Sequence, residues 1–240
     1  MKYLVHCILR NRLAAPETRK NSVRLIASGT LAAAVTPVGN ETAAPDTSQL
    51  LAYETVISAL HASGTVIPLR YGCLIEDESQ IGRLLDERRI EYEGLLDRLE
   101  GRVEIGLRVL WEARAEGHDI PAPATPGAAY LAAIRKRHDT AMGRNNMGLS
   151  NMDLNHVEQE WAGRLCAGLA GLYSEDRREA RPAPPGCVVS LYFLVPKAAV
   201  LQFRGRLRRT VLGEGRRFLV SGPWPPYNFV MPEVQRRSGA

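Results

Sequence analysis

The order of apolar and polar positions predicts that the chain opens with β-strands. Residues 3–9 are rich in β-forming side chains, and two further strand signals, 23–27 and 30–37, follow. The Ser28-Gly29 pair between these two signals is typical of a tight turn, so they should form a hairpin.

Helical spacing dominates the next part of the chain. Asp46 or Thr47 can cap a helix that runs to about His61, and a strongly amphipathic stretch follows from residue 81 to 99, either as one helix or as two that meet near Glu91. The expected apolar positions are Leu50, Leu51, Val56, Ile57 and Leu60 in the first helix and Ile81, Leu84, Leu85, Tyr92, Leu95, Leu96 and Leu99 in the second stretch.

A period of two from Val103 to Trp111 predicts a half-buried strand directly after a possible seam at Glu100-Gly101. The later signals are helices at 128–142 and 153–173, an Asn-rich loop within 143–155, a proline-rich connector at 181–186, strands at 188–195 and 216–221, and a helix at 197–212. This order predicts the α+β class, with two α+β domains at residues 1–100 and 101–240. The second domain should pack its helices on one face of a sheet and contain a helical insertion at about 128–175.

The composition is that of an ordinary globular protein and changes this picture little. The 240 residues are 45% apolar and 24% charged, with a net charge of +5 and four cysteines. The cysteines show no metal or disulfide spacing, which favours a reducing compartment. The N-terminal apolar run is too short for a signal peptide, and no run approaches the roughly eighteen apolar residues of a membrane span. We expect a cytoplasmic protein that does not associate with a membrane.

No nucleophile, phosphate-loop or metal motif occurs, so catalysis has little support from the sequence. His6 and Cys7 are adjacent in a strand and should point to opposite faces, and His61 should act as a cation at a helix C-terminus. An enzyme with a Cys73- or His-centred site stays open as an alternative, because Cys73 is in a turn-like setting. A less favoured alternative is a nucleic-acid-binding regulator that uses Arg204, Arg208, Arg209, Arg216 and Arg217.

Two segments combine rigid backbone residues with large side chains. We call residues Val66 to Gly72 the Pro-Leu-Arg segment and residues Ser221 to Phe229 the closing segment. The first could simply be an edge strand and a turn. The second could lock the last strand onto the C-terminal domain through Trp224 and Tyr227, or present a preorganised surface to a partner. The partner-binding or architectural candidates are Pro68, Arg70, Tyr71, Gly72, Pro223, Trp224, Pro225, Pro226, Tyr227 and Phe229.

The two segments, together with residues 103–109 and 127–131, resemble the GvpL/GvpF family of gas vesicle synthesis proteins. The closing segment, Ser-Gly-Pro-Trp-Pro-Pro-Tyr-Asn-Phe, is the most specific element of this likeness. The resemblance implies two α+β domains, the second like a modified ferredoxin fold. It implies a non-enzymatic, vesicle-associated assembly protein whose partners are the hydrophobic shell subunit and other vesicle proteins. It brings no catalytic, cofactor or metal residues, no small-molecule substrate and no nucleic acid.

Overall fold

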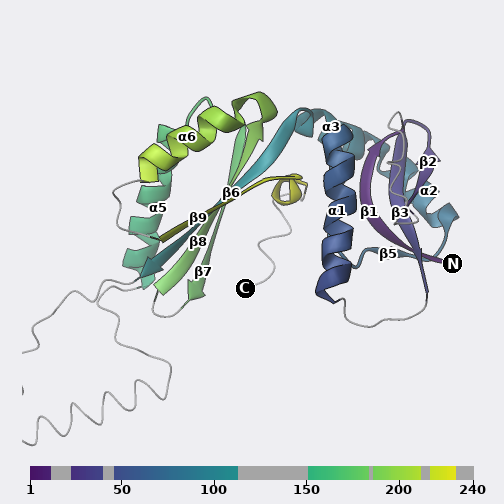
Figure 1. Cartoon of the computed structure of the whole chain (residues 1–240), viewed down its shortest axis with the longest axis horizontal. Coiled ribbons are helices and arrows are strands. Elements are labelled where there is room, and N and C mark those ends of the chain that lie inside the picture. The colour runs from purple at the N-terminus through teal and green to yellow at the C-terminus, as the bar shows by residue number, and fades with distance from the viewer. Residues whose placement is uncertain (12–22, 40–45, 113–150, 184–185, 212–216, 231–240) are drawn as a thin grey trace, which may run out of the picture.

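The computed structural model describes residues 1–11, 23–39, 46–112, 151–183, 186–211 and 217–230 (Figure 1). These residues form two antiparallel sheets, each with its own helices, which lie side by side along the long axis of the molecule. The α+β class predicted from the sequence is therefore confirmed. Within the described residues, no helix combines the length and the apolarity needed to cross a membrane.

The first half of the molecule has three layers: one sheet, with helices on both of its faces. Its central strand pairs with β3 on one side and with β4 and β5 on the other, while β2 pairs with the outer side of β3. The turn at Gly29 has a positive φ of 57°, as the predicted hairpin requires. The elements are β1 (Lys2–Arg10), β2 (Arg24–Ser28), β3 (Leu31–Val38), α1 (Thr47–Ser63), β4 (Val66–Pro68), β5 (Leu74–Ile75), α2 (Glu78–Glu87) and α3 (Arg89–Leu99).

Helix α1 covers one face of this sheet and begins where the sequence predicts. The Asp46 side chain accepts a hydrogen bond from the backbone N–H of Gln49 at 2.8 Å, which caps the helix. Two of the apolar positions expected from the helical spacing, Leu50 and Leu51, lie outside the core, since they are 43% and 63% exposed. Tyr53 occupies the core at this level instead, because it is the residue on the side of the helix that faces the sheet.

Helices α2 and α3 cover the opposite face, and the chain breaks between them at Arg88. The amphipathic stretch therefore forms two helices rather than one, and its predicted apolar stripe is confirmed, because all seven residues belong to or pack against one buried cluster.

A β-bulge in β1 changes the direction of its side chains. The pairing register between β1 and β3 shifts between Val5 and Cys7. His6 stacks on Tyr53 of α1 at 4.6 Å between ring centroids, and Cys7 belongs to the same buried cluster as Tyr53. The prediction that His6 and Cys7 point to opposite faces is wrong, because it assumed a regular strand.

The second sheet has the strand order β7-β8-β6-β9, and its described helices lie on one face, as predicted. Its core contains the alternating residues Val103, Ile105, Leu107 and Val109. The elements are β6 (Arg102–Glu112), α5 (Asn151–Gly168), β7 (Glu175–Ala183), β8 (Gly186–Pro196), the 3-10 helix η1 (Lys197–Ala199), α6 (Val200–Val211), β9 (Arg217–Trp224) and the 3-10 helix η2 (Tyr227–Phe229).

One strand of this sheet was missed. Residues 181–183 belong to β7, which forms a hairpin with β8, so the predicted connector at 181–186 is wrong. β7 is an edge strand with the sequence EDRREARPA, and it has no apolar alternation to reveal it. The predicted helix at 128–142, and the predicted loop as far as residue 150, lie outside the described residues.

The first sheet and its helices end with α3, and the second sheet begins with β6, next to the predicted seam at Glu100-Gly101. Buried contacts nevertheless cross this point, because Leu194 and Phe229 belong to the same cluster as Tyr3 and Val5 of the first sheet. The division into domains at 1–100 and 101–240 stays a prediction, and so does the finer likeness to a modified ferredoxin fold.

Candidate functional site

The closing segment leaves the second sheet and enters the space between the two sheets. β9 ends at Trp224, Pro225 and Pro226 are buried, and η2 follows, drawn as the short curl between the two sheets in Figure 1. Hydrogen bonds from the N–H of Tyr227 to the carbonyl of Pro225 (2.8 Å) and from the N–H of Phe229 to that of Pro226 (3.1 Å) hold the turn.

A buried carboxylate fastens this turn to the second sheet. Glu104 of β6 is only 4% exposed. One of its oxygens accepts the backbone N–H of Asn228 at 2.8 Å, and the other accepts the side-chain amide of Asn228 at 2.7 Å. Hydrogen bonds to a charged acceptor are stronger than neutral ones, so this pair fixes both the position and the orientation of η2.

Tyr227 ties the same turn to the first sheet. Its hydroxyl donates to Glu54 of α1 at 2.7 Å, and the ring packs against the cluster that α1 covers. Burial, together with this hydrogen bond, raises the pKa of Tyr227, so the hydroxyl stays protonated as a donor. The prediction that Tyr227 locks β9 onto the C-terminal domain is therefore wrong, because Tyr227 bonds to α1 in the first half of the molecule.

Phe229 completes the connection. Its ring is fully buried in the cluster formed by the first sheet, α2 and α3, and the guanidinium of Arg177 on β7 lies 6.0 Å from the ring centroid. Arg98 of α3 donates to the carbonyl of Phe229 and also forms an ion pair with Glu175 of β7 at 3.6 Å. η2 therefore contacts elements of both halves.

The Pro-Leu-Arg segment also packs against α1, through the same buried cluster as Tyr227. Pro68 is buried in β4, Arg70 is exposed, and Gly72 turns the chain with a φ of +95°. Tyr71 meets Tyr53 edge-on at 5.1 Å between ring centroids, and the Tyr53 hydroxyl donates to the carbonyl of Leu69 at 3.0 Å. Because Tyr53 and Glu54 are adjacent on α1, this helix links the Pro-Leu-Arg segment to the closing segment.

The two halves also meet at the C-terminal end of α1. His61 hydrogen-bonds through Nε2 to the carbonyl of Arg102 at 3.2 Å, and Lys197 donates to the carbonyl of His61 at 3.3 Å. Burial and the nearby Lys197 charge lower the pKa of His61. The predicted cationic role of His61 is wrong, because the imidazole is buried and stays neutral near pH 7.

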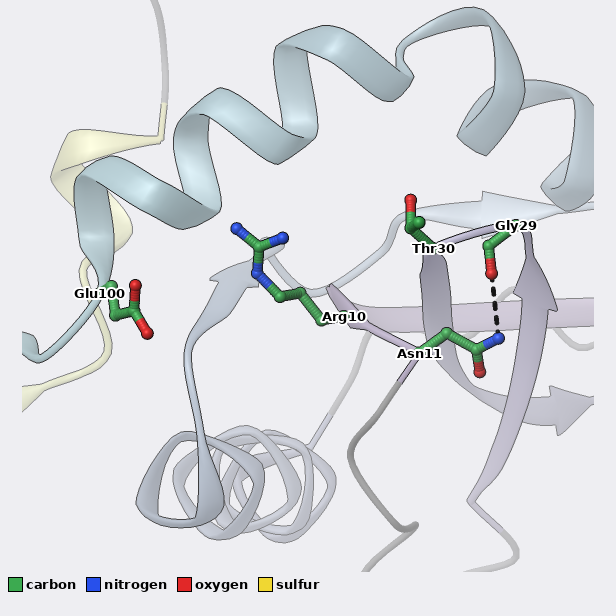
Figure 2. Close-up of a pocket in the computed structure, with 5 residues that line it drawn as sticks. All are labelled: Arg10, Asn11, Gly29, Thr30 and Glu100. Atoms are coloured by element: carbon green, nitrogen blue, oxygen red, sulfur yellow. Dashed lines mark hydrogen bonds between the residues drawn. The ribbon is translucent and has the colours of Figure 1, made fainter.

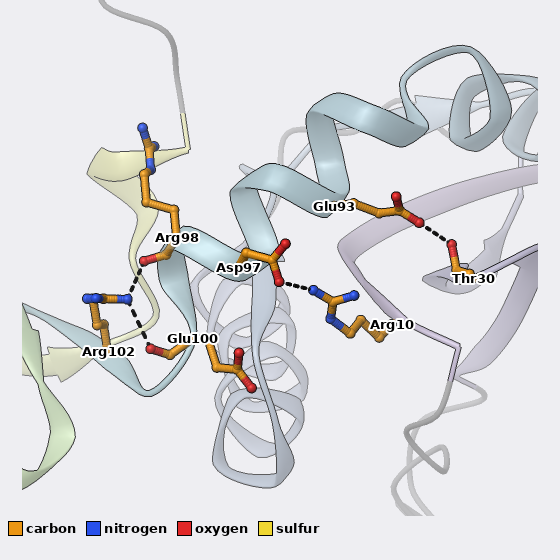
Figure 3. Close-up of polar contacts among 7 residues, drawn as sticks. All are labelled: Arg10, Thr30, Glu93, Asp97, Arg98, Glu100 and Arg102. Carbon is orange, nitrogen blue, oxygen red and sulfur yellow. Dashed lines mark hydrogen bonds and ion pairs between the residues drawn. The ribbon is translucent and has the colours of Figure 1, made fainter.

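A hollow of ≈ 490 Å³ lies at the end of β1, lined by Arg10, Asn11, Gly29, Thr30 and Glu100 (Figure 2). Most of its polar groups already bond within the chain. Arg10 pairs with Asp97, and Thr30 donates to Glu93. Arg102, which does not line the hollow, donates to the carbonyls of Arg98 and Glu100 (Figure 3). Asn11 donates to the carbonyl of Gly29 at 3.0 Å. These contacts brace α3 against β1 and β6, and they leave few groups to bind a substrate.

The residues behind the alternative functions are spread over the molecule. Cys73 is half-buried, and burial raises the pKa of its thiol, which disfavours the reactive thiolate. Burial also lowers the pKa of His6 to about 4, and its Nε2 hydrogen-bonds to Thr36 at 2.8 Å. Of the five arginines considered for nucleic acid, Arg204 donates to the carbonyl of Gly222, and residue 216 lies outside the described residues.

Sequence reasoning did not single out the polar partners of the closing segment. Glu104 is one polar position of an alternating strand, and no pattern in the sequence distinguishes Glu54 from the other polar residues of its helix. Asn228 lies inside the closing segment but has no aromatic or proline character. The sequence does show Glu104 in the strand next to the closing strand. Whether its carboxylate is buried, however, depends on the turn that covers it.

Comparisons with known proteins agree with this architecture. The family model described as "Gas vesicle synthesis protein GvpL/GvpF" matches residues 3–231. The chain is 26% identical over 211 residues to gas vesicle protein F of Streptomyces sp. (strain CB03234), with 87% of each chain covered. It is 28% identical over 181 residues to gas vesicle protein L of the same strain, which covers 74% of this chain and 67% of the relative.

Two crystal structures share the fold. GvpF from Microcystis aeruginosa superposes with a TM-score of 0.68 at 16% identity, covering 96% of this chain and 99% of the other. GvpF from Anabaena sp. PCC7120 gives a TM-score of 0.65 at 18% identity, covering 96% and 98%. At these identities the superpositions establish the arrangement of the elements and nothing about binding.

Proposed function

Since the chain belongs to the GvpL/GvpF family of gas vesicle synthesis proteins, with a part in gas vesicle assembly, we propose that it binds the hydrophobic shell subunit and other vesicle proteins during nucleation or shell formation. The observation that carries the proposal is the match over residues 3–231, which includes both halves of the molecule and the closing segment between them. Catalysis is not part of the proposal, because the family is one of vesicle proteins and the titratable candidates lie apart.

The physical need for such a protein comes from the shell subunit. A small hydrophobic subunit exposes apolar surface and strand edges before it assembles, and such surfaces aggregate. A folded protein that covers them would hold the subunit until it joins the shell. In this proposal the protein acts at the gas vesicle, on shell subunits that have not yet joined the shell.

The closing segment, in this proposal, acts mainly through architecture. Pro225, Pro226 and Phe229 are buried and cannot touch a partner without unfolding the turn, and Tyr227 is engaged with α1. By holding η2 against α1 and β6, the segment would keep the two halves in one orientation and so preorganise any surface that they share. The candidates still accessible to a partner are Arg70, Gly72, Pro223 and Trp224.

The test is a pull-down of the tagged chain from cells that make gas vesicles, probed for the shell subunit and the accessory proteins. Recovery of the shell subunit is expected, and failure to recover any vesicle protein would refute the proposal. Labelling of isolated vesicles with an antibody, before and after a urea wash, reports whether the protein stays on the shell.

Two variants separate architecture from direct contact. Trp224 is 43% exposed, whereas Phe229 is fully buried. If the closing segment is architectural, Trp224→Ala keeps the pull-down and Phe229→Ala loses it together with stability. If Trp224 touches the partner, Trp224→Ala loses the pull-down while the melting temperature stays unchanged, and the architectural assignment fails.

A further inference from the structure

The second sheet ends in an edge that no described strand covers. β9 is the last strand in the order β7-β8-β6-β9 and pairs with β6 on one side only. Every second residue of such a strand directs its backbone N–H and C=O away from the sheet, where another strand can pair with them. The register shift between Glu104 and Gly106 marks the point at which regular pairing with β6 ends. The regular edge therefore runs from Arg217 to Ser221.

Apolar side chains flank this edge on both faces of the sheet. Leu219 is 60% exposed and pairs with Arg108 on the face away from the described helices. Val220 is 36% exposed and pairs with Leu107 on the face that α6 covers. There it lines a hollow of ≈ 120 Å³ together with Arg204, Leu207 and Arg208. A strand added to β9 would place alternate side chains on these two faces.

Within the described residues, the charged side chains of α6 and β9 have one sign. Helix α6 and strand β9 contain no Asp or Glu, and their arginines are Arg204, Arg206, Arg208, Arg209 and Arg217. Arg108, Arg208 and Arg217 form no ion pair within the part of the chain that the structure describes. A surface of this kind attracts negative charge and repels positive charge, so it selects partners as well as binding them.

We propose that the outer edge of β9 binds an extended acidic segment of a partner protein, which adds to the second sheet as a further strand. Main-chain hydrogen bonds along Arg217 to Ser221 supply affinity, and the apolar side chains of the added strand, which share one face, pack on Leu219. Its carboxylates lie on the opposite face, toward Arg208 of α6. A nucleic acid could use the arginines, but it would not pair with the backbone edge. This inference is separate from the proposed binding of the shell subunit, because it rests only on this edge and its arginines.

The test uses the full chain and a fluorescent peptide of about eight residues that alternates valine and glutamate, followed by anisotropy at physiological salt. We expect this peptide to bind at least about tenfold more tightly than its valine–lysine counterpart, or than the same acidic peptide with every backbone N–H methylated. The methylated peptide keeps the charges and side chains and can no longer donate strand-pairing hydrogen bonds.

Two charge reversals on one helix provide the matched control. Arg208 lines the hollow beside Val220, whereas Arg206 is exposed on the same helix and does not. Arg208→Glu should weaken binding about tenfold, and Arg206→Glu should leave it within about twofold. Equal losses in both variants, equal binding of the methylated peptide, absence of binding, or preference for a single-stranded oligonucleotide would each overturn the proposal. A failed shell-subunit pull-down would not affect it, so the two proposals fail separately.

Discussion

Replacing Phe229 by alanine tests whether the closing segment joins the two halves of the molecule. The ring is fully buried, and the cluster that surrounds it includes Leu194 of the second sheet and Tyr3 of the first. Truncating a buried phenylalanine costs about 3–5 kcal/mol, because the apolar transfer energy is lost and a cavity remains. The contact with Arg177 adds about 0.5–1 kcal/mol to the loss. We therefore expect Phe229→Ala to lower the free energy of unfolding by about 5 kcal/mol.

Urea unfolding, followed by circular dichroism and by tryptophan fluorescence, measures this change. If η2 couples the halves, the two signals should coincide in the parent protein and separate in the variant, since each half then unfolds by itself. Leu219→Ala is the control, because that side chain is 60% exposed and its loss should change stability by no more than about 0.5 kcal/mol. A loss below about 1 kcal/mol in Phe229→Ala, with coincident transitions, would refute the packing argument.

Three further perturbations follow from the same region and from β1. Gly222→Ala should lower the melting temperature strongly, because Gly222 has a φ of +97° and an added Cβ would lie 2.5 Å from the carbonyl oxygen of Glu104; a neutral result would contradict this geometry. Tyr227→Phe should cost about 1–2 kcal/mol in urea unfolding, and little when Glu54→Ala is already present, whereas additive losses would exclude the pairing. Burial lowers the pKa of His6 from 6.5 to about 4, so the unfolded chain binds more protons between these values. Stability should therefore fall by about 3 kcal/mol as the pH drops from 6.5 to 4, and His6→Gln should remove this pH dependence.

The family and the main elements could be predicted from the sequence because they depend on local patterns. The period of two in β6, the apolar stripe of α2 and α3, and the cap at Asp46 each depend on residues that are close together in the sequence. β7 escaped prediction because it is an edge strand whose charged residues need no buried face. The directions of His6 and Cys7 depended on a bulge that no local pattern marks.

For the candidate site, the sequence determined which residues are unusual, and the tertiary structure decided what they touch. The prolines and aromatics of the closing segment are visible in the chain, and so is the glycine that turns the Pro-Leu-Arg segment. Their shared neighbour, α1, is not, since Tyr53 and Glu54 look like ordinary residues of an amphipathic helix. Only folding brings Glu54 and Glu104 within hydrogen-bonding distance of the segment that ends at Phe229. Contacts between positions so far apart in the chain arise from the packing of whole sheets, and no local spacing encodes them.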